Sequence, residues 1–120
     1  MKGYLFLEYP ACGTCRKAKK WLDEQKVDYT DRHIVEERPT REELKIWFER
    51  SGLPLRKFFN TSGLLYKSMQ LREKLDGMSG EEQLELLASD GKLVKRPLVI
   101  GEDFVLVGFK PEEWKTVLLK

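Results

Sequence analysis

The sequence has few of the residues that hold permanent cross-links or metal ions. Its 120 residues include two cysteines and one histidine, whereas a structural zinc site needs about four ligands. Cys12, Cys15 and His33 would therefore need ligands from a second chain, and we expect no metal site. A chain of this length also buries a hydrophobic core without help from disulfides, so we expect no disulfide framework.

An excess of one charge and long apolar runs are missing as well. Lysine and arginine number 22 against 20 for aspartate and glutamate, so no strong field attracts nucleic acid or an anionic membrane. No segment approaches the ~20 apolar residues of a membrane span. Glu8 cuts the apolar N-terminal patch short of a secretory signal. We therefore expect a cytoplasmic protein that binds neither nucleic acid directly nor a membrane.

Repeats, low-complexity tracts and linkers are also missing, which favours a single domain over residues 1–120. The nearly continuous apolar run within Lys2–Glu8 predicts a strand covered on both faces, central in a sheet. A helix is expected to begin inside the cysteine motif, and Val27–Ile34 predicts a second, more exposed strand. Strand, helix and strand form a β-α-β unit with parallel strands.

The middle of the chain, about residues 39–92, predicts a helical insertion. Thr40 with Glu43, and Ser79 with Glu82, match the capping box that opens a helix. Residues 53–67 predict a short helix and a loop, and residues 70–75 another short helix.

The last third predicts a hairpin and a helix. Residues 98–100 and 104–107 are apolar and flank a Gly-Glu-Asp turn, and Pro111 suits the first turn of a helix. The whole order is β-α-β, helical insertion, β-β-α, an α/β fold.

The two cysteines are separated by two residues where the first strand leads into the helix. Their sulfurs can approach across one helical turn, and Cys12 lies at the positive end of the helix dipole. Arg16 and Lys17 add positive charge, and we expect both effects to lower the pKa of the Cys12 thiol. Without export, such a pair is typical of a catalytic or sensing disulfide. We predict that Cys12 is the nucleophile and Cys15 the resolving thiol.

Other interpretations of these residues remain open. The two cysteines could be ordinary core residues, although Pro10, Gly13 and Thr14 around them are typical of a loop. His33 is more typical of a solvated or core histidine than of a catalytic base. We assign it no role.

Arg96 and Pro97 come just before the hairpin strand expected beside the first strand. A cis peptide bond at Pro97 would make a tight turn opposite the cysteines and expose backbone groups to a substrate. Arg96 would then present a forked cation to an anion on Cys12. The alternative is a trans proline that starts an edge strand beside a solvated arginine. The neighbouring cysteine motif favours the first interpretation.

Three motifs follow one another along the chain: YPACGTCR at 9–16, KRPLVI at 95–100 and GFKPEE at 108–113. Together they resemble the arsenate reductase (ArsC)/Spx family, and the resemblance spans nearly the whole chain, including residues 39–44 and 51–53. It implies a thioredoxin-like fold with a mixed four-stranded sheet, the helical insertion and a cis-proline.

The resemblance also implies roles for site residues. Glutaredoxin-coupled arsenate reductases attack arsenate with one cysteine, which matches Cys12, and hold the oxyanion with three arginines. Arg96 matches one of these; Asn60 and Lys110 stand at the other two positions, so the clamp is incomplete. Arg56 could substitute. Cys15 stands where those reductases commonly have serine and matches the redox pair of Spx-like regulators.

Two functions follow as expectations. The first is an arsenate reductase-like thiol–disulfide oxidoreductase without a bound cofactor, acting on a small oxyanion or a protein thiol. Its external reductant would be glutathione with glutaredoxin, or thioredoxin. The second is an Spx-like redox-sensing transcription regulator that binds the RNA polymerase α subunit, partly through a glycine that Gly52 resembles. Gly52 is equally explained as a helix C-cap.

Overall fold

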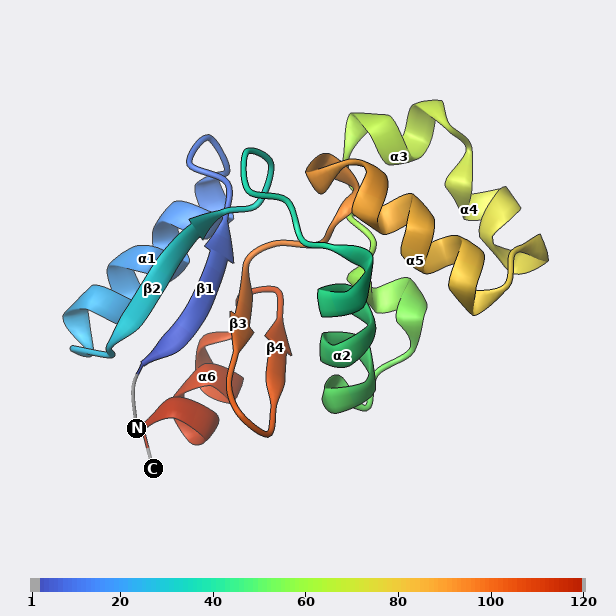
Figure 1. Ribbon diagram of the computed structural model, residues 1–120. Coiled ribbons are helices and arrows are strands. Elements are labelled where there is room, and N and C mark those ends of the chain that lie inside the picture. Colours follow the sequence, from blue (N-terminus) through green and yellow to red (C-terminus); the bar gives the residue numbers. More distant parts are fainter. Residues whose placement is uncertain (1–2, 120) are drawn as a thin grey trace.

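The computed structural model describes residues 3–119. Lys2, where the sequence places the start of the first strand, lies outside the described residues. The chain forms β1 (Tyr4–Glu8), α1 (Gly13–Glu24) and β2 (Tyr29–His33), then a helical segment, then β3 (Leu98–Ile100), β4 (Val105–Val107) and α6 (Pro111–Leu118). The predicted order of elements is confirmed (Figure 1).

The four strands form one mixed sheet in the order β2-β1-β3-β4. β1 runs parallel to β2, with Tyr4 opposite Tyr29. β3 runs antiparallel to both β1 and β4, with Val99 paired to Phe6 on one side and to Leu106 on the other. The predicted central place of β1 and the greater exposure of β2, which lies at the edge of the sheet, are confirmed. With its β-α-β and β-β-α halves, this is a thioredoxin-like fold.

One face of the sheet is covered by α1 and α6. Phe6 and Val99 from the sheet pack with Ala18 and Leu22 of α1 and with Trp114 of α6. The Trp114 indole also donates a hydrogen bond to the Gly108 carbonyl at 3.0 Å. This packing holds the first turn of α1, and with it the cysteines, against the end of β1.

The helices of the insertion pack against the other face and beyond β4 (Figure 1). They are α2 (Arg41–Ser51), α3 (Leu64–Ser68), α4 (Leu71–Lys74) and α5 (Gly80–Ser89). Their core contains Leu44, Trp47, Phe58 and Leu87, together with Leu7 from β1. Apolar side chains therefore tie the insertion to the sheet that carries the site.

Side-chain caps fix where α2 and α5 begin. Thr40 Oγ1 accepts from the Glu43 amide at 3.1 Å, and the Glu43 carboxylate accepts from the Thr40 amide at 3.0 Å. Ser79 and Glu82 repeat this exchange at 3.1 and 2.8 Å. Gly52 ends α2 with φ +70°, a conformation that favours glycine. Both predicted capping boxes are confirmed.

The structure differs from the sequence prediction in short segments. Residues 53–67 contain more helix than expected, with a 3₁₀ turn over Leu55–Phe58 before α3. The helix predicted over residues 70–75 splits into α4 and a 3₁₀ turn over Leu75–Gly77. β4 begins one residue late, because the Phe104 carbonyl accepts the Gly101 amide in the hairpin turn at 2.9 Å.

Among residues 3–119, the helices are too short or too polar to cross a membrane.

Candidate functional site

Cys12 lies at the N-cap of α1, just after the loop that leaves β1. Its Sγ accepts a hydrogen bond from the Cys15 amide at 3.4 Å, and its own amide donates to the Tyr9 carbonyl at 2.9 Å. The side chain is half-buried. A cysteine at this position uses its sulfur to satisfy an amide at the start of the helix, which otherwise has no partner in the helix.

The surroundings of Cys12 favour its thiolate. Burial raises the pKa of the Cys12 thiol, but hydrogen bonds from the Cys15 amide and side chain and the charge of Arg96 outweigh burial and lower that pKa below its ordinary value. The cation that acts on Cys12 is thus Arg96, from the far end of the sequence.

Cys15 has the opposite character. It is fully buried, and its Sγ accepts from the Tyr9 amide at 3.5 Å. Burial raises the pKa of the Cys15 thiol to about 12, with the neighbouring Cys12 adding to the effect. Both cysteines are free thiols in the structure. One helical turn therefore presents an accessible acidic thiol above a protected, weakly acidic one.

Arg96 and Pro97 stand opposite the cysteines, as predicted, and their peptide bond is cis. The guanidinium carbon of Arg96 lies 4.7 Å from the centroid of the Tyr9 ring, a cation–π contact. Nη1 of Arg96 is buried without a hydrogen-bond partner among the described residues. The Pro97 carbonyl accepts the Gly108 amide at 2.9 Å. The Pro97 carbonyl is thus engaged within the protein, and the expectation that this turn offers its backbone to a substrate stays a prediction.

A hollow of about 850 Å³ opens over Cys12 between the insertion and the start of α6. Asn60 lies in its wall, where its side-chain amide donates to the Lys92 carbonyl at 3.3 Å and its backbone amide to the Leu93 carbonyl at 2.8 Å. Lys110 is exposed at the N-cap of α6 in the same hollow. The structure thus brings Cys12, Arg96, Asn60 and Lys110 around one space.

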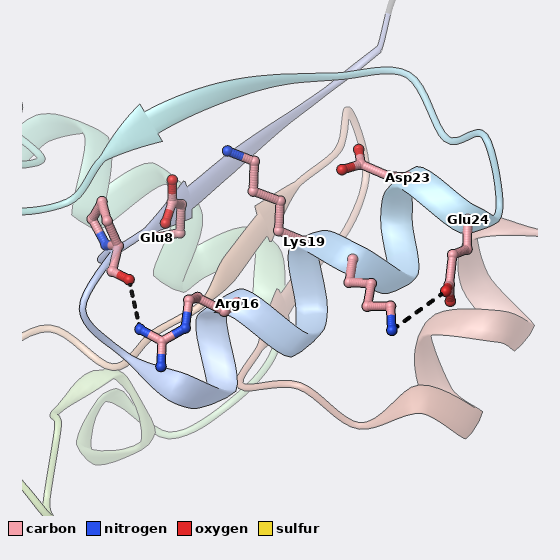
Figure 2. A pocket seen from close by; sticks show the side chains of 7 residues that line it. Glu8, Arg16, Lys19, Asp23 and Glu24 are labelled. Carbon is pink, nitrogen blue, oxygen red and sulfur yellow. Dashed lines mark hydrogen bonds and ion pairs between the residues drawn. The ribbon is translucent and has the colours of Figure 1, made fainter.

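Arg16 is not part of this hollow. Its guanidinium donates to the Pro10 carbonyl at 3.0 Å, and the side chain lines a different hollow on the outer side of α1. Figure 2 shows this hollow, with Arg16 turned along the loop and Lys19, Asp23 and Glu24 following it along the helix. A role for Arg16 in binding an anion at Cys12 stays a prediction, because in the structure its guanidinium is bound to the Pro10 carbonyl and its side chain lines the other hollow.

Sequence reasoning missed Glu8. This carboxylate ends β1 and is 6 % exposed. Burial, with a hydrogen bond to Asp31 on β2, raises the pKa of Glu8 to about 7, although Lys19 on α1 opposes the shift. Lys19 binds Asp31 at 2.7 Å. The sequence signal that could have identified Glu8 is its place at the end of the apolar run of a central strand. A charged side chain buried there needs a partner.

His33 has a structural explanation. Its Nδ1 accepts hydrogen bonds from the amides of Val35 and Glu36 at 3.2 and 3.0 Å, which closes the turn after β2. Residues 3–119 contain no cluster of three or more histidine, cysteine or acidic side chains placed to hold a metal ion.

A model of the ArsC family matches residues 7–117. The chain belongs to the ArsC family. A crystal structure of an ArsC family related protein from Bacteroides fragilis is 64 % identical, has a TM-score of 0.93 and covers 97 % of each chain.

Two curated relatives come from Bacillus subtilis. The uncharacterized protein YusI is 56 % identical over 110 residues, which cover 92 % of this chain and 93 % of YusI. The regulatory protein MgsR is 33 % identical over 108 residues, which cover 90 % of this chain and 84 % of MgsR. The relatives of this ArsC-family chain therefore include one that is named as a regulatory protein.

Proposed function

We propose that this ArsC-family chain is a thiol–disulfide oxidoreductase in which Cys12 attacks and Cys15 resolves. The observation that carries the proposal is the opposite character of two thiols within one helical turn. The pKa of Cys12 is lowered at a half-buried helix N-cap, whereas burial raises the pKa of Cys15 to about 12. Such a pair attacks from one sulfur and keeps the other protonated until it is needed.

The reaction follows in two exchanges. The Cys12 thiolate attacks one sulfur of a substrate disulfide, forming a mixed disulfide and releasing the other substrate sulfur as a thiolate. Cys15 then loses its proton and attacks the Cys12 sulfur, which closes the Cys12–Cys15 disulfide and releases the second substrate thiol. The substrate gains two electrons from the pair. An external thiol, glutathione with glutaredoxin or thioredoxin, returns them.

Arg96 supports an anion at Cys12. Its charge lowers the pKa of the Cys12 thiol. Its buried Nη1 donates no hydrogen bond to any of the described residues and so is available to an anion. Asn60 offers a neutral amide already bound to the Lys92 carbonyl, and Lys110 lacks the forked geometry of arginine. One arginine and a lysine hold a tetrahedral oxyanion less well than three arginines. We therefore favour a disulfide over arsenate as the substrate.

A coupled assay with glutaredoxin and glutathione tests the proposal. The wild-type protein, Cys12→Ser and Cys15→Ser would each receive a mixed disulfide of glutathione in one arm and arsenate in the other. We expect turnover of the disulfide that Cys12→Ser abolishes, and slow or absent arsenate reduction. Equal rates for wild type and Cys12→Ser in both arms would contradict an enzymatic role.

A regulator is the second candidate, because MgsR is similar over 90 % of the chain. In that case, the same disulfide would change a surface that binds the RNA polymerase α subunit. Gly52 is exposed at the end of α2, but its φ of +70° explains the glycine without a partner. Capture of the α subunit by wild type, lost in a folded Gly52→Arg variant but kept in Gly52→Asn, would favour the regulator.

A further inference from the structure

Two exposed leucines lie beside the space over Cys12. Leu53 lines the Cys12 hollow and is 36 % exposed. Leu64, which is 86 % exposed, lines a neighbouring hollow that shares Asn60 and Arg96 with the first. Figure 1 shows α3, which begins at Leu64, and the loop that follows β1 along the same upper edge of the molecule, with the helical insertion extending to the right of the sheet. A body wide enough to cover both adjoining hollows therefore meets both leucines.

The fold does not need an apolar side chain at residue 64. Leu64 is the first residue of the five-residue helix α3. Tyr66 anchors that helix, since it is buried with its ring 6.2 Å from the ring of Phe59. Leu65 packs against the same core. Because these two residues attach α3 to the molecule, Leu64 is left facing solvent.

The charges beside the leucines are mostly positive. Among the described residues that line the Cys12 hollow, the positively charged ones are Arg56, Lys57, Lys95, Arg96 and Lys110, and Glu113 is negatively charged. Arg56 is paired with Asp76 at 2.6 Å. Lys57, Lys95 and Lys110 have no ion-pair partner within residues 3–119. The combination attracts an acidic surface.

We infer that Leu53, Leu64, Lys57, Lys95 and Lys110 form a docking rim for an acidic protein that presents the thiol or disulfide exchanged with Cys12. The inference rests on the proposed function and specifies the size and charge of the partner. The partner's apolar contact covers the leucines, and its carboxylates face the lysines.

A protein partner explains features that a small anion does not. A small anion bound beside Cys12 and Arg96 fits within the first hollow and makes no contact with Leu64, which lines the adjoining hollow. A protein whose thiol stands on its surface must bring a wide area down onto Cys12, and apolar anchors surrounded by charge stabilise such contacts. The lysines speed encounter with an acidic partner.

The test compares two reductants of the Cys12–Cys15 disulfide. Oxidised protein is mixed either with reduced thioredoxin of negative net charge or with dithiothreitol, and disulfide loss is followed by stopped-flow tryptophan fluorescence. We expect Leu64→Ser to lower the ratio of the thioredoxin rate to the dithiothreitol rate by about tenfold, the loss of one apolar anchor. Lys57→Glu should lower the same ratio, with the largest effect at low salt.

Matched controls carry the same changes elsewhere. Ile46→Ser removes an apolar side chain that is 51 % exposed on α2, and Lys20→Glu reverses a charge on the outer side of α1. Both should keep the wild-type ratio. A ratio unchanged in Leu64→Ser and Lys57→Glu would overturn the docking rim while leaving the proposed function intact.

Two further outcomes would overturn the docking rim. A concentration-dependent dimer that Leu64→Ser abolishes would assign the leucines to a second copy of this chain and overturn the inference. Failure of Cys12 and Cys15 to form any disulfide would overturn the proposed function and, with it, the docking rim.

Discussion

At the scale of single residues, the proposed reaction depends on how differently the two thiols ionise. Hydrogen bonds from Cys15 and the charge of Arg96 lower the pKa of Cys12, and burial raises that of Cys15 to about 12. In Cys15→Ser, we expect alkylation of Cys12 by iodoacetamide to reach half its maximal rate below the pH of an ordinary thiol. In Cys12→Ser, the remaining thiol should react slowly up to pH 10. Similar pH profiles for the two variants would contradict the assignment of nucleophile.

Arg96 should contribute measurably to this ionisation. Its guanidinium supplies a charge-assisted contact to the Cys12 sulfur. Loss of ~1 kcal/mol of thiolate stabilisation in Arg96→Gln would slow alkylation of Cys12 near neutral pH by roughly fivefold. Lys110→Gln is the matched control, since Lys110 does not shift the pKa of Cys12. Equal slowing in both variants would show that the summed positive charge around the hollow, and not Arg96 in particular, stabilises the Cys12 thiolate.

Sequence reasoning reached some of these residues and missed others for physical reasons. The spacing of Cys12 and Cys15 and the Arg96-Pro97 pair carry local signals, and the structure brings all four together. Arg16 was assigned to the site by its proximity along the chain, but its side chain binds the Pro10 carbonyl. Proximity in sequence does not determine the direction in which a long side chain extends from the first turn of a helix.

At the scale of secondary-structure elements, the capping boxes that begin α2 and α5 were the features that the sequence predicted most directly. Thr40 and Ser79 each exchange two hydrogen bonds with a glutamate three residues later, and this pattern depends on neighbours in sequence alone. The 3₁₀ turn over Leu75–Gly77 depends instead on the burial of Leu75 in the core that the insertion shares with the sheet. Its type and bounds could therefore not be read from a local pattern.

The cap at Thr40 makes an element-scale prediction. Thr40→Ala removes the acceptor of the Glu43 amide and should lower the free energy of unfolding by about 1 kcal/mol. Urea denaturation followed by circular dichroism measures the loss, with Thr116→Ala as the control, since Thr116 is exposed and bonds its own helix. A Thr40→Ala variant as stable as that control would contradict the cap.

At the scale of the whole molecule, Glu8 makes stability depend on pH. Its folded pKa is about 7, above the ordinary value of 4.5. A carboxyl with a raised folded pKa stabilises the fold fully below its unfolded pKa, and that contribution is lost as pH rises through the folded pKa. The contribution of Glu8 is therefore present near pH 4.5 and lost above pH 7, when its charge is buried beside Asp31.

Glu8→Gln isolates this effect. Glutamine copies the protonated side chain and can still donate to Asp31, so the variant should melt at a higher temperature than wild type at pH 8. The gap should narrow toward pH 5, where wild-type Glu8 is itself protonated. Thermal unfolding at a series of pH values measures the difference. A wild-type protein more stable than Glu8→Gln at pH 8 would show that Lys19 outweighs burial.

The arrangement of the whole molecule was readable in outline because its two halves alternate strand and helix and because three motifs resemble one family. The way the insertion packs on the sheet could not be predicted from the sequence. The packing of Phe58, Leu87 and Leu7 joins segments that are far apart in the chain. The hollow over Cys12 is a product of that packing.

The most direct test of the central claim is the fate of the two sulfurs under mild oxidation. The reduced protein is treated with low peroxide, trapped with an alkylating agent and analysed by mass spectrometry after proteolysis. The account predicts one peptide in which Cys12 and Cys15 are joined by a disulfide, reversed by an external thiol. Two alkylatable thiols that persist, or Cys12 driven to sulfinic acid while Cys15 stays reduced, would contradict it.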